Sequence, residues 1–329
     1  MKVAFLFGGS GYIGYYILTR FLEQNKFDRY VIYDINPPKY FDKLPEEVTF
    51  VSCDVRNPIP SFEQEINTPA SWIFNLAAIH REPGHQAHEY FDTNIQGAKN
   101  INAFAERTGV LNLFFTSSIA PFGRSLNIST ESSPLYPETP YGISKSMAEL
   151  IHKNWLGTDT YKRLIIVRPS VIYGPKDPGN IYRTIKALKK GLFMLPNGGN
   201  VIKAYGYVYG LVDSILFTMS KTDREITYNY AEYPLVNLKE MTQEIKKELH
   251  YGKPTFSVPV SALALVASCI QIAFKVIGKK SDIHPTRVRK AGFPTNIKPQ
   301  YLIDNGFDFK YGFLKSLRHW KSVEPKDFM

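Results

Sequence analysis

The sequence is poor in cysteine and contains no internal repeat or low-complexity tract. Cys53 and Cys269 are the only two cysteines in 329 residues. Two distant thiols exclude a disulfide scaffold and a cysteine-based zinc site. We therefore expect a protein of a reducing, cytoplasmic compartment.

Acidic residues are fewer than basic ones, with 30 Asp and Glu against 40 Lys and Arg and a formal net charge of +10. Such a charge attracts nucleic acid, an anionic membrane or a phosphorylated small molecule. The basic residues are spread along the chain, which favours a small anion and gives no reason to expect a nucleic acid partner.

Long hydrophobic runs are also scarce. The apolar start "MKVAFLFGGSGYIG" ends at glycines without a cleavage pattern, so we expect a first strand there and no signal peptide. Residues 259–278, "PVSALALVASCIQIAFKVIG", approach the roughly 20 residues that cross a bilayer. Their serines, Gln271 and Lys275 disfavour a span, so we expect a buried or surface-lying helix and no membrane partner.

Short apolar runs alternate with helical patterns in the first half of the chain. Strands are predicted at 2–7, 29–35, 48–55, 71–78, 111–118 and 164–174, and helices at 12–24 and 89–107. This alternation predicts an α/β fold with a doubly wound parallel (Rossmann) sheet and a smaller, irregular C-terminal lobe. We assign residues 1–175 to the dinucleotide-binding domain, with 201–222 returning to it. The substrate-binding lobe then comprises 176–200 and 223–329.

Glycines join the first strand to the first helix in "FGGSGYIG". Gly8, Gly11 and Gly14 allow a sharp turn and close approach of a pyrophosphate to the helix N-terminus. Asp34 follows 20 residues after Gly14, where a carboxylate accepts hydrogen bonds from ribose hydroxyls and repels a 2′-phosphate. Since "INPPKY" after it contains no arginine, NAD is favoured over NADP, although Lys39 keeps NADP open.

Further motifs follow in a fixed order: "CDVR" at 53–56, "NLAA" at 75–78, "FTSS" at 115–118, "YGISK" at 141–145 and "RPSVIYGP" at 168–175. Together with the glycines they resemble the extended short-chain dehydrogenases/reductases. The chain is similar to the NAD-dependent epimerase/dehydratase family, in particular to its nucleotide-sugar epimerases.

The resemblance implies that Tyr141 is the acid/base catalyst and Lys145 its partner. A free phenol has a pKa of about 10, and a nearby ammonium favours the phenolate. A separation of four residues on a helix places the two side chains on one face. We therefore expect Lys145 to lower the pKa of Tyr141 and to hold the nicotinamide ribose.

The resemblance also implies roles for a residue at a strand end, Ser118, and for a helix residue, Asn94. Ser118 would hydrogen-bond the reacting oxygen, and Asn94 would link a water to the lysine. The remaining cofactor contacts implied are Ser10, Tyr12, Ile13, Asp54, Val55, Ala77, Ala78 and Pro169, together with the glycines, Asp34, Tyr141 and Lys145.

Two positions depart from the pattern of nucleotide-sugar enzymes, because Val171 replaces an asparagine and Lys203 an arginine. The substrate contacts we expect are His80, Arg81, Arg183 and Lys203, and Arg287, Arg289 and Lys290 are further candidates for phosphate. His80, His85 and His88 lack the acidic or cysteine partners of a metal site, so no metal is expected.

These residues predict an NAD-dependent isomerase or oxidoreductase, most simply a nucleotide-sugar epimerase. The segment "SSIAPFG" lacks the acidic pair that a dehydratase needs after its serine. Two alternatives stay open: an oxidoreductase like the 3β-hydroxysteroid dehydrogenases, acting on an apolar alcohol, and a non-catalytic NAD(H)-binding regulator. The resemblance implies a homodimer formed through a helix bundle.

Overall fold

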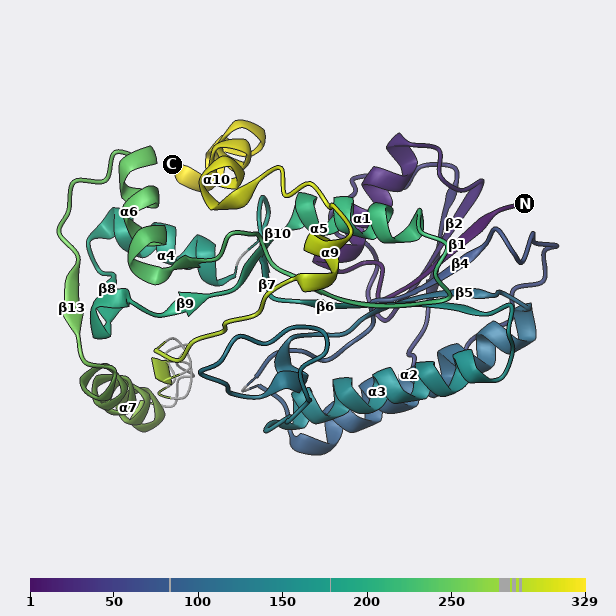
Figure 1. The fold of residues 1–329 in the computed structure, drawn as a ribbon, viewed down its shortest axis with the longest axis horizontal. Coiled ribbons are helices and arrows are strands. Elements are labelled where there is room, and N and C mark those ends of the chain that lie inside the picture. Colours follow the sequence, from purple (N-terminus) through teal and green to yellow (C-terminus); the bar gives the residue numbers. More distant parts are fainter. Residues whose placement is uncertain (83, 178, 278–284, 286–287, 290–291) are drawn as a thin grey trace.

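The computed structural model describes residues 1–82, 84–177, 179–277, 285, 288–289 and 292–329, and a parallel sheet of seven strands lies at its centre (Figure 1). The strand order is β11-β6-β5-β4-β1-β2-β3. The strands are β1 (Val3–Phe7), β2 (Arg29–Asp34), β3 (Val48–Ser52), β4 (Trp72–Asn75), β5 (Asn112–Thr116), β6 (Arg163–Pro169) and β11 (Glu225–Tyr230). The predicted doubly wound α/β sheet is confirmed.

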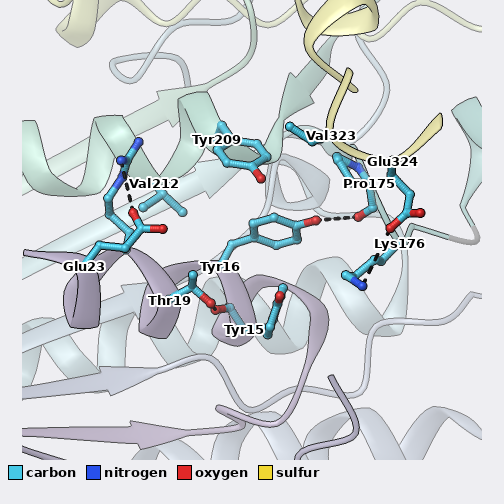
Figure 2. Close-up of a pocket in the computed structure, with 11 residues that line it drawn as sticks. Tyr15, Tyr16, Thr19, Glu23, Pro175, Lys176, Tyr209, Val212, Val323 and Glu324 are labelled. Atoms are coloured by element: carbon cyan, nitrogen blue, oxygen red, sulfur yellow. Dashed lines mark hydrogen bonds and ion pairs between the residues drawn. The ribbon is translucent and has the colours of Figure 1, made fainter. Parts of the chain in front are cut away.

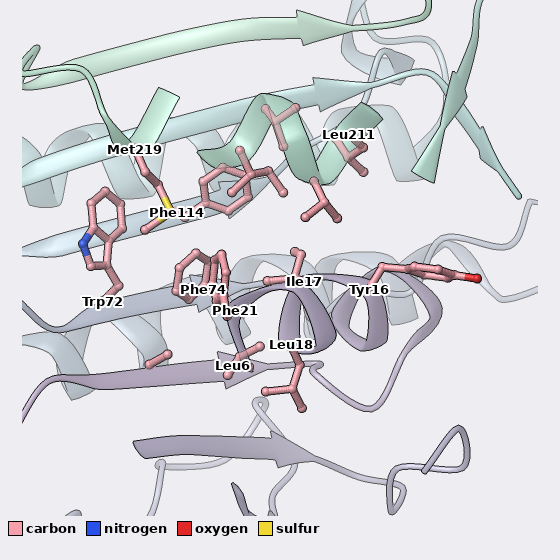
Figure 3. Close-up of a cluster of buried hydrophobic side chains, with 14 of the residues drawn as sticks. Leu6, Tyr16, Ile17, Leu18, Phe21, Trp72, Phe74, Phe114, Leu211 and Met219 are labelled. Carbon is pink, nitrogen blue, oxygen red and sulfur yellow. The ribbon is translucent and has the colours of Figure 1, made fainter. Parts of the chain in front are cut away.

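Helices cover both faces of this sheet (Figure 1). One face carries α1 (Tyr12–Glu23), α5 (Val208–Met219) and the short α9 (Gln300–Asp304), and the other carries α2 (Ala87–Thr108) and α3 (Pro140–Gly157). Because side chains alternate along a strand, β1 supplies Ala4 and Leu6 to the first core and Val3, Phe5 and Phe7 to the second. Figure 3 shows the first core, where Leu6, Ile17 and Phe74 pack under α5.

The C-terminal part is smaller and less regular. Its helices are α4 (Asn180–Lys190), α6 (Leu238–Glu248), α7 (Val260–Val276) and α10 (Gly312–Val323). Its strands form three small pairs: β7 (Val171–Tyr173) with β10 (Tyr205–Tyr207), β9 (Ile202–Lys203) with β12 (Val236–Asn237), and β8 (Met194–Pro196) with β13 (Phe256–Val258). Short 3-10 turns lie at Ala120–Phe122, Asn197–Gly199 and Pro325–Phe328. A separate core of Ile185, Met241, Ile245, Leu317 and Trp320 holds α4, α6 and α10 together.

Two features of the sheet differ from the sequence prediction. The predicted strand 164–174 is interrupted at Ser170, after which β7 leaves the main sheet and pairs with β10. Residues Glu225–Tyr230, which we placed in the substrate lobe, form the edge strand β11 and pair with β6. An edge strand alternates polar and apolar residues, so it lacks the continuous apolar run that marks a buried parallel strand. The division into two domains stays a prediction.

The helix expected at 259–278 lies on the outside of the small lobe as α7 (Figure 1). Among the residues that the structure describes, no helix is long and apolar enough to cross a membrane. Of the two placements that the sequence left open, burial and a surface position, α7 takes the surface position.

Candidate active site

The glycine loop after β1 is shaped by close backbone contacts. Gly8 has a φ of 75°, and a Cβ there would lie 2.6 Å from the backbone of Ala77. A Cβ on Gly14 would lie 2.4 Å from the carbonyl oxygen of Gly9. Side chains are therefore excluded at both positions, which lets the loop pass directly over the end of β4 and into α1. Gly11 is the N-cap of α1.

The N-terminus of α1 is suited to an anion. Gly11 provides no capping side chain, so the first amides of the helix keep their hydrogen-bonding capacity. The hydroxyls of Ser10 and Tyr12 are buried, and neither has a hydrogen-bond partner among the described residues. Tyr12 and Ile13 open the helix itself. Uncapped amides and unsatisfied buried hydroxyls beside a glycine loop fit the pyrophosphate of a dinucleotide.

Asp34 lies at the carboxyl end of β2, next to this loop. Its carboxylate accepts hydrogen bonds from the backbone amides of Ser10 and Asn36, both at 3.1 Å. These bonds fix the carboxylate beside the glycine loop, where it can accept hydrogen bonds from a ribose.

The residues after β3 and β4 form the neighbouring walls. Asp54 is bound by the guanidinium of Arg56, with Nη2 and Oδ2 2.6 Å apart, and this hydrogen bond lowers the pKa of Asp54. Val55 is buried, and a Cβ on Gly97 of α2 would lie 2.9 Å from it. Ala77 and Ala78 follow β4, with Ala77 against Gly8. This edge of the sheet thus contains every predicted cofactor position near the first four strands.

Helix α3 begins with a well-defined cap. The hydroxyl of Thr139 accepts a hydrogen bond from the amide of Gly142, and Pro140 occupies the first turn. A Cβ on Gly142 would lie 2.8 Å from the carbonyl oxygen of Ala120, so glycine allows α3 to approach the turn that follows Ser118. The first turn of α3, which carries Tyr141, is thereby held against the end of β5.

Tyr141 and Ser118 form a hydrogen-bonded pair. Burial raises the pKa of Tyr141 to about 12, and the hydrogen bond with Ser118 opposes this rise. Ser118 also accepts a hydrogen bond from the amide of Ala120 at 3.1 Å. We expected the Lys145 ammonium to lower the pKa of Tyr141, but in the structure the lowering comes from Ser118 and burial outweighs it.

Lys145 is almost fully buried one turn further along α3. Its ammonium lies over the ring of Phe115, 4.3 Å from the centroid. Burial lowers its pKa to about 7, and the Glu149 carboxylate opposes this shift. A group of this pKa changes its charge in the physiological range, which is unusual for a lysine.

A buried ion pair that we did not predict lies behind Lys145. Arg168 on β6 binds both carboxylate oxygens of Glu149, at 3.0 and 2.7 Å. The hydroxyl of Ser117 donates to the same carboxylate at 2.5 Å. Glu149 follows Lys145 by four residues, as Lys145 follows Tyr141, so this spacing of polar residues on one buried face was the available sequence signal.

His152 continues this buried polar face. Its Nδ1 lies 2.7 Å from Oδ1 of Asn102, and its Nε2 lies 3.0 Å from Nδ2 of Asn75. Burial, assisted by the Lys145 charge, lowers its pKa to about 3, so the ring is neutral. Because Oδ1 only accepts and the amide Nδ2 only donates, the proton resides on Nδ1.

Asn94 on α2 connects α3 to the loop after β4. Its amide nitrogen donates to the Ser144 hydroxyl at 2.8 Å, and its Oδ1 accepts from the amide of Ile79 at 3.1 Å. Ser144 lies between Tyr141 and Lys145 along the chain, so Asn94 fixes the helix turn that carries them. The predicted link through a water stays a prediction.

The predicted substrate residues lie on separate elements, unlike the predicted cofactor residues at the edge of the sheet. His80 and Arg81 are exposed on the loop after β4, and the carbonyl oxygen of Arg81 accepts a hydrogen bond from Tyr90. Arg183 is exposed on α4. Lys203 is buried on β9, donates to the carbonyl oxygen of Phe293, and has a pKa lowered to about 8 by burial.

The remaining predicted positions fall into two groups. Pro169 is buried at the end of β6, where its carbonyl oxygen accepts from the amide of Ile119 at 3.2 Å. Arg289 is exposed, whereas Arg287 and Lys290 lie outside the described residues. No group of His, Cys, Asp or Glu arranged to hold a metal ion occurs within the described part of the chain.

One cavity lies apart from all of these residues. Figure 2 shows it beside α1 and α5, with the hydroxyl of Tyr16 donating to the carbonyl oxygen of Pro175 at 2.6 Å. Its volume is about 270 Å³, and none of the residues predicted for catalysis, cofactor or substrate lines it. It is therefore separate from the site around Tyr141.

Comparison with known proteins gives three kinds of match. The family model of the NAD dependent epimerase/dehydratase family matches residues 4–231. The N-acetyl-alpha-D-glucosaminyl-diphospho-ditrans,octacis-undecaprenol 4-epimerase of Escherichia coli O157:H7 is 31% identical over 318 residues, which covers 95% of this chain and 92% of that protein. The 3beta-hydroxysteroid-dehydrogenase/decarboxylase isoform 1 of Arabidopsis thaliana is 23% identical over 269 residues, 74% of this chain and 58% of the plant protein.

A solved structure of the same fold is the UDP-glucose 4-epimerase of Thermotoga maritima, crystallised with UDP-glucose. It is 16% identical, has a TM-score of 0.73, and the match covers 98% of this chain and 99% of that one. At this identity the similarity shows the fold alone.

Proposed function

Because the chain belongs to the NAD dependent epimerase/dehydratase family, we propose that it is a 4-epimerase acting on a sugar that is joined to its carrier through a diphosphate. It is an enzyme, its cofactor is NAD, and the non-catalytic alternative is thereby set aside. The observation that supports the 4-epimerase most strongly is the 31% identity to the Escherichia coli 4-epimerase over 95% of the chain, which extends into the substrate lobe.

The residues of the chain hold the cofactor at the carboxyl edge of the sheet. The amides at the start of α1 and the hydroxyl of Ser10 bind the pyrophosphate, and Asp34 binds the adenosine ribose. Lys145 holds the nicotinamide ribose. When bound, the nicotinamide supplies the hydride acceptor and donor for C4 of the sugar.

In its deprotonated form Tyr141 accepts the proton of the C4 hydroxyl as C4 gives up its hydride, and Ser118 hydrogen-bonds the same oxygen, which leaves a 4-keto sugar. Return of hydrogen to the opposite face of C4 gives the epimer, and Tyr141 gives the proton back. Burial raises the pKa of Tyr141 to about 12 and lowers the pKa of Lys145 to about 7. Turnover should therefore rise with pH as the phenolate of Tyr141 forms.

The diphosphate can be carried by a nucleotide or by a lipid. The motifs resemble nucleotide-sugar epimerases, and the Thermotoga enzyme was crystallised with UDP-glucose. The Escherichia coli relative is named for a sugar on diphospho-undecaprenol, and the departures at Val171 and Lys203 weaken the match to nucleotide-sugar enzymes. Both carriers present the same sugar diphosphate to the site.

The test measures epimerisation of N-acetylglucosaminyl diphosphate carried by undecaprenol or by uridine, with NAD present and NMR of the sugar ring as readout. Inversion at C4 of either substrate supports the proposal, and the ratio of kcat/KM identifies the carrier. Oxidation of a 3β-hydroxysteroid with no inversion of either sugar would contradict it and would favour the steroid alternative.

A further inference from the structure

Helix α7 exposes several of its larger apolar side chains. Leu265 is 67% exposed, Val266 56% and Ile272 63%, and the side chains buried beneath the helix are Ala264 and Ala267. Residues 265, 266, 269, 272 and 273 follow the spacing of one helical face. We call these five residues the outer face of α7.

This arrangement is the reverse of an ordinary surface helix. A single exposed leucine needs no explanation, but an apolar stripe over more than two turns of a helix marks an interaction surface. The sequence 260–276 contains no Asp or Glu, and its only charged residue is Lys275. Two further apolar side chains, Met194 and Phe256, are exposed where β8 pairs with β13, the strand that leads into α7.

The charge of the neighbouring sequence identifies the partner. From residue 275 to 290 the chain contains six Lys and Arg residues and one acidic residue, Asp282, within a protein of net charge +10. An apolar helix followed along the chain by basic residues is the combination that binds the interface of an anionic lipid bilayer. The net charge of +10 opposes a symmetric contact between two copies of the chain, because like charges repel.

We infer that the outer face of α7 lies in the interface of an anionic membrane, with the helix parallel to the bilayer surface. This replaces our expectation from the sequence that the chain has no membrane partner. A helix of 17 residues with this composition lies on a bilayer and does not cross it.

The position of α7 relates this surface to the substrate lobe. A Cβ on Gly292 would lie 2.3 Å from the side chain of Val260, the first residue of α7. The next residue, Phe293, accepts the hydrogen bond from Lys203, and the guanidinium of Arg124 lies 5.8 Å from its ring centroid. A membrane in contact with α7 is therefore close to Lys203, one of the expected substrate contacts, which would let a lipid carrier stay in the bilayer while its sugar enters the enzyme.

The test is sedimentation of the purified full chain with vesicles of phosphatidylglycerol and phosphatidylethanolamine, compared with vesicles of phosphatidylcholine. We expect at least tenfold stronger partitioning to the anionic vesicles, weakened by salt. The double variant Leu265→Gln, Ile272→Gln should lose this binding at least tenfold. The matched control, Leu126→Gln with Ile128→Gln, changes a similarly exposed Leu and Ile in a loop outside α7 and should bind like the parent.

A chain that stays in the supernatant with anionic vesicles, or a double variant that binds like the parent, would overturn the inference. Loss of a dimer in the double variant by analytical ultracentrifugation, without vesicle binding by the parent, would assign the outer face to a second copy. Only the idea that α7 brings the enzyme to a lipid-carried substrate rests on the proposed function. Vesicle binding needs no turnover, so binding without epimerisation would refute the proposed function alone.

Discussion

Helices α3 and α7 depart from the usual pattern of a surface helix in opposite directions. Half of the eight buried residues of α3 are polar or charged: Ser144, Lys145, Glu149 and His152. Among the described side chains of α7 the buried ones are alanines, whereas Leu265, Val266 and Ile272 are exposed. The first helix carries charge inside the protein, and the second carries hydrophobic surface outside it.

Both departures reduce stability, and they serve different ends. Burying an ion requires partners for it, which Arg168 and Ser117 provide for Glu149. Exposing an apolar face forgoes the roughly 1.5–3 kcal/mol that burial of each large side chain contributes. We therefore interpret α3 as the helix that carries catalytic residues and α7 as the helix that binds the membrane. Variants in α3 should affect turnover and stability, and variants in α7 should affect membrane binding.

The largest effect is expected at Tyr141, in the first turn of α3. Tyr141→Phe keeps the ring and removes the proton acceptor, so turnover should fall by about 10²- to 10⁴-fold with NAD affinity retained. Steady-state kinetics and NAD titration measure the two quantities. Tyr136→Phe, at a position 70% exposed, is the control and should leave both unchanged. Turnover of Tyr141→Phe at the parental rate would show that Tyr141 is not the proton acceptor.

The next effect concerns the interior of the same helix. Arg168→Leu leaves the buried Glu149 carboxylate without its guanidinium, which should lower the free energy of unfolding by about 3–5 kcal/mol. Arg124→Leu breaks a pair with Glu138 that is exposed, with Nε and Oε2 2.6 Å apart, and should cost about 1 kcal/mol or less. Urea unfolding compares the two variants. Equal decreases in the free energy of unfolding would show that the buried pair contributes no more to stability than the exposed pair.

A smaller effect, of opposite sign, is expected at Lys145. Its pKa of about 7 in the folded chain lies below the ordinary 10.5, so between these values the unfolded chain binds a proton that the folded chain has released. Stability then rises with pH through this window, and below pH 7 the buried ammonium is retained at a cost. Lys145→Met should raise the free energy of unfolding at pH 6 by more than about 1 kcal/mol, since one pKa unit is ~1.4 kcal/mol.

At pH 9.5 the same substitution should raise the free energy of unfolding by less, because Lys145 of the folded parent is then neutral and burying it costs less. Urea unfolding of both proteins without NAD gives the two values. A difference between variant and parent that does not change with pH would show that the ammonium of Lys145 is not desolvated in the folded chain.

The smallest effect is expected on the outer face of α7. Leu265→Gln should change the free energy of unfolding by no more than about 0.5 kcal/mol, because the side chain contacts little in the folded chain. Leu156→Ala, at a position 3% exposed in α3, should cost about 2–5 kcal/mol. Thermal unfolding in lipid-free buffer separates them. A loss above 1 kcal/mol in Leu265→Gln would mean that the face of α7 contributes to the folded core.

The Rossmann part of the fold could be predicted because its signals are local. Continuous apolar strands, the glycine turn ahead of Tyr12 and the acidic residue at the end of β2 each act within a few residues of the chain. The edge strand β11 was missed because polar residues alternate along it, and β7 was merged with β6 because no turn residue separates them beyond Ser170. Strand pairing between distant segments decides both.

The positions of Asp34, Ala77 and Ser118 were predictable because the motifs mark the ends of β2, β4 and β5. The partners of those residues were not predictable, since the contact between Glu149 and Arg168 joins a helix and a strand 19 residues apart. Nor could the sequence show that burial would raise the pKa of Tyr141 more than its polar neighbours lower it, because desolvation depends on the whole surrounding structure. The orientation of α7 could not be predicted either. Apolar residues occur on every side of this helix, so the sequence does not indicate which side faces outward.

The most direct test of the proposed chemistry is the fate of the hydrogen on C4. The sugar diphosphate that the carrier comparison selects is prepared with deuterium at C4 and converted by the purified enzyme in ordinary water with NAD. We expect the 4-epimer to keep its deuterium at C4, because the hydride that leaves that carbon returns to it from the cofactor within the same site. A 4-epimer that has lost its deuterium to solvent would contradict this mechanism, and deuterium accumulating in released cofactor without inversion at C4 would contradict the 4-epimerase itself.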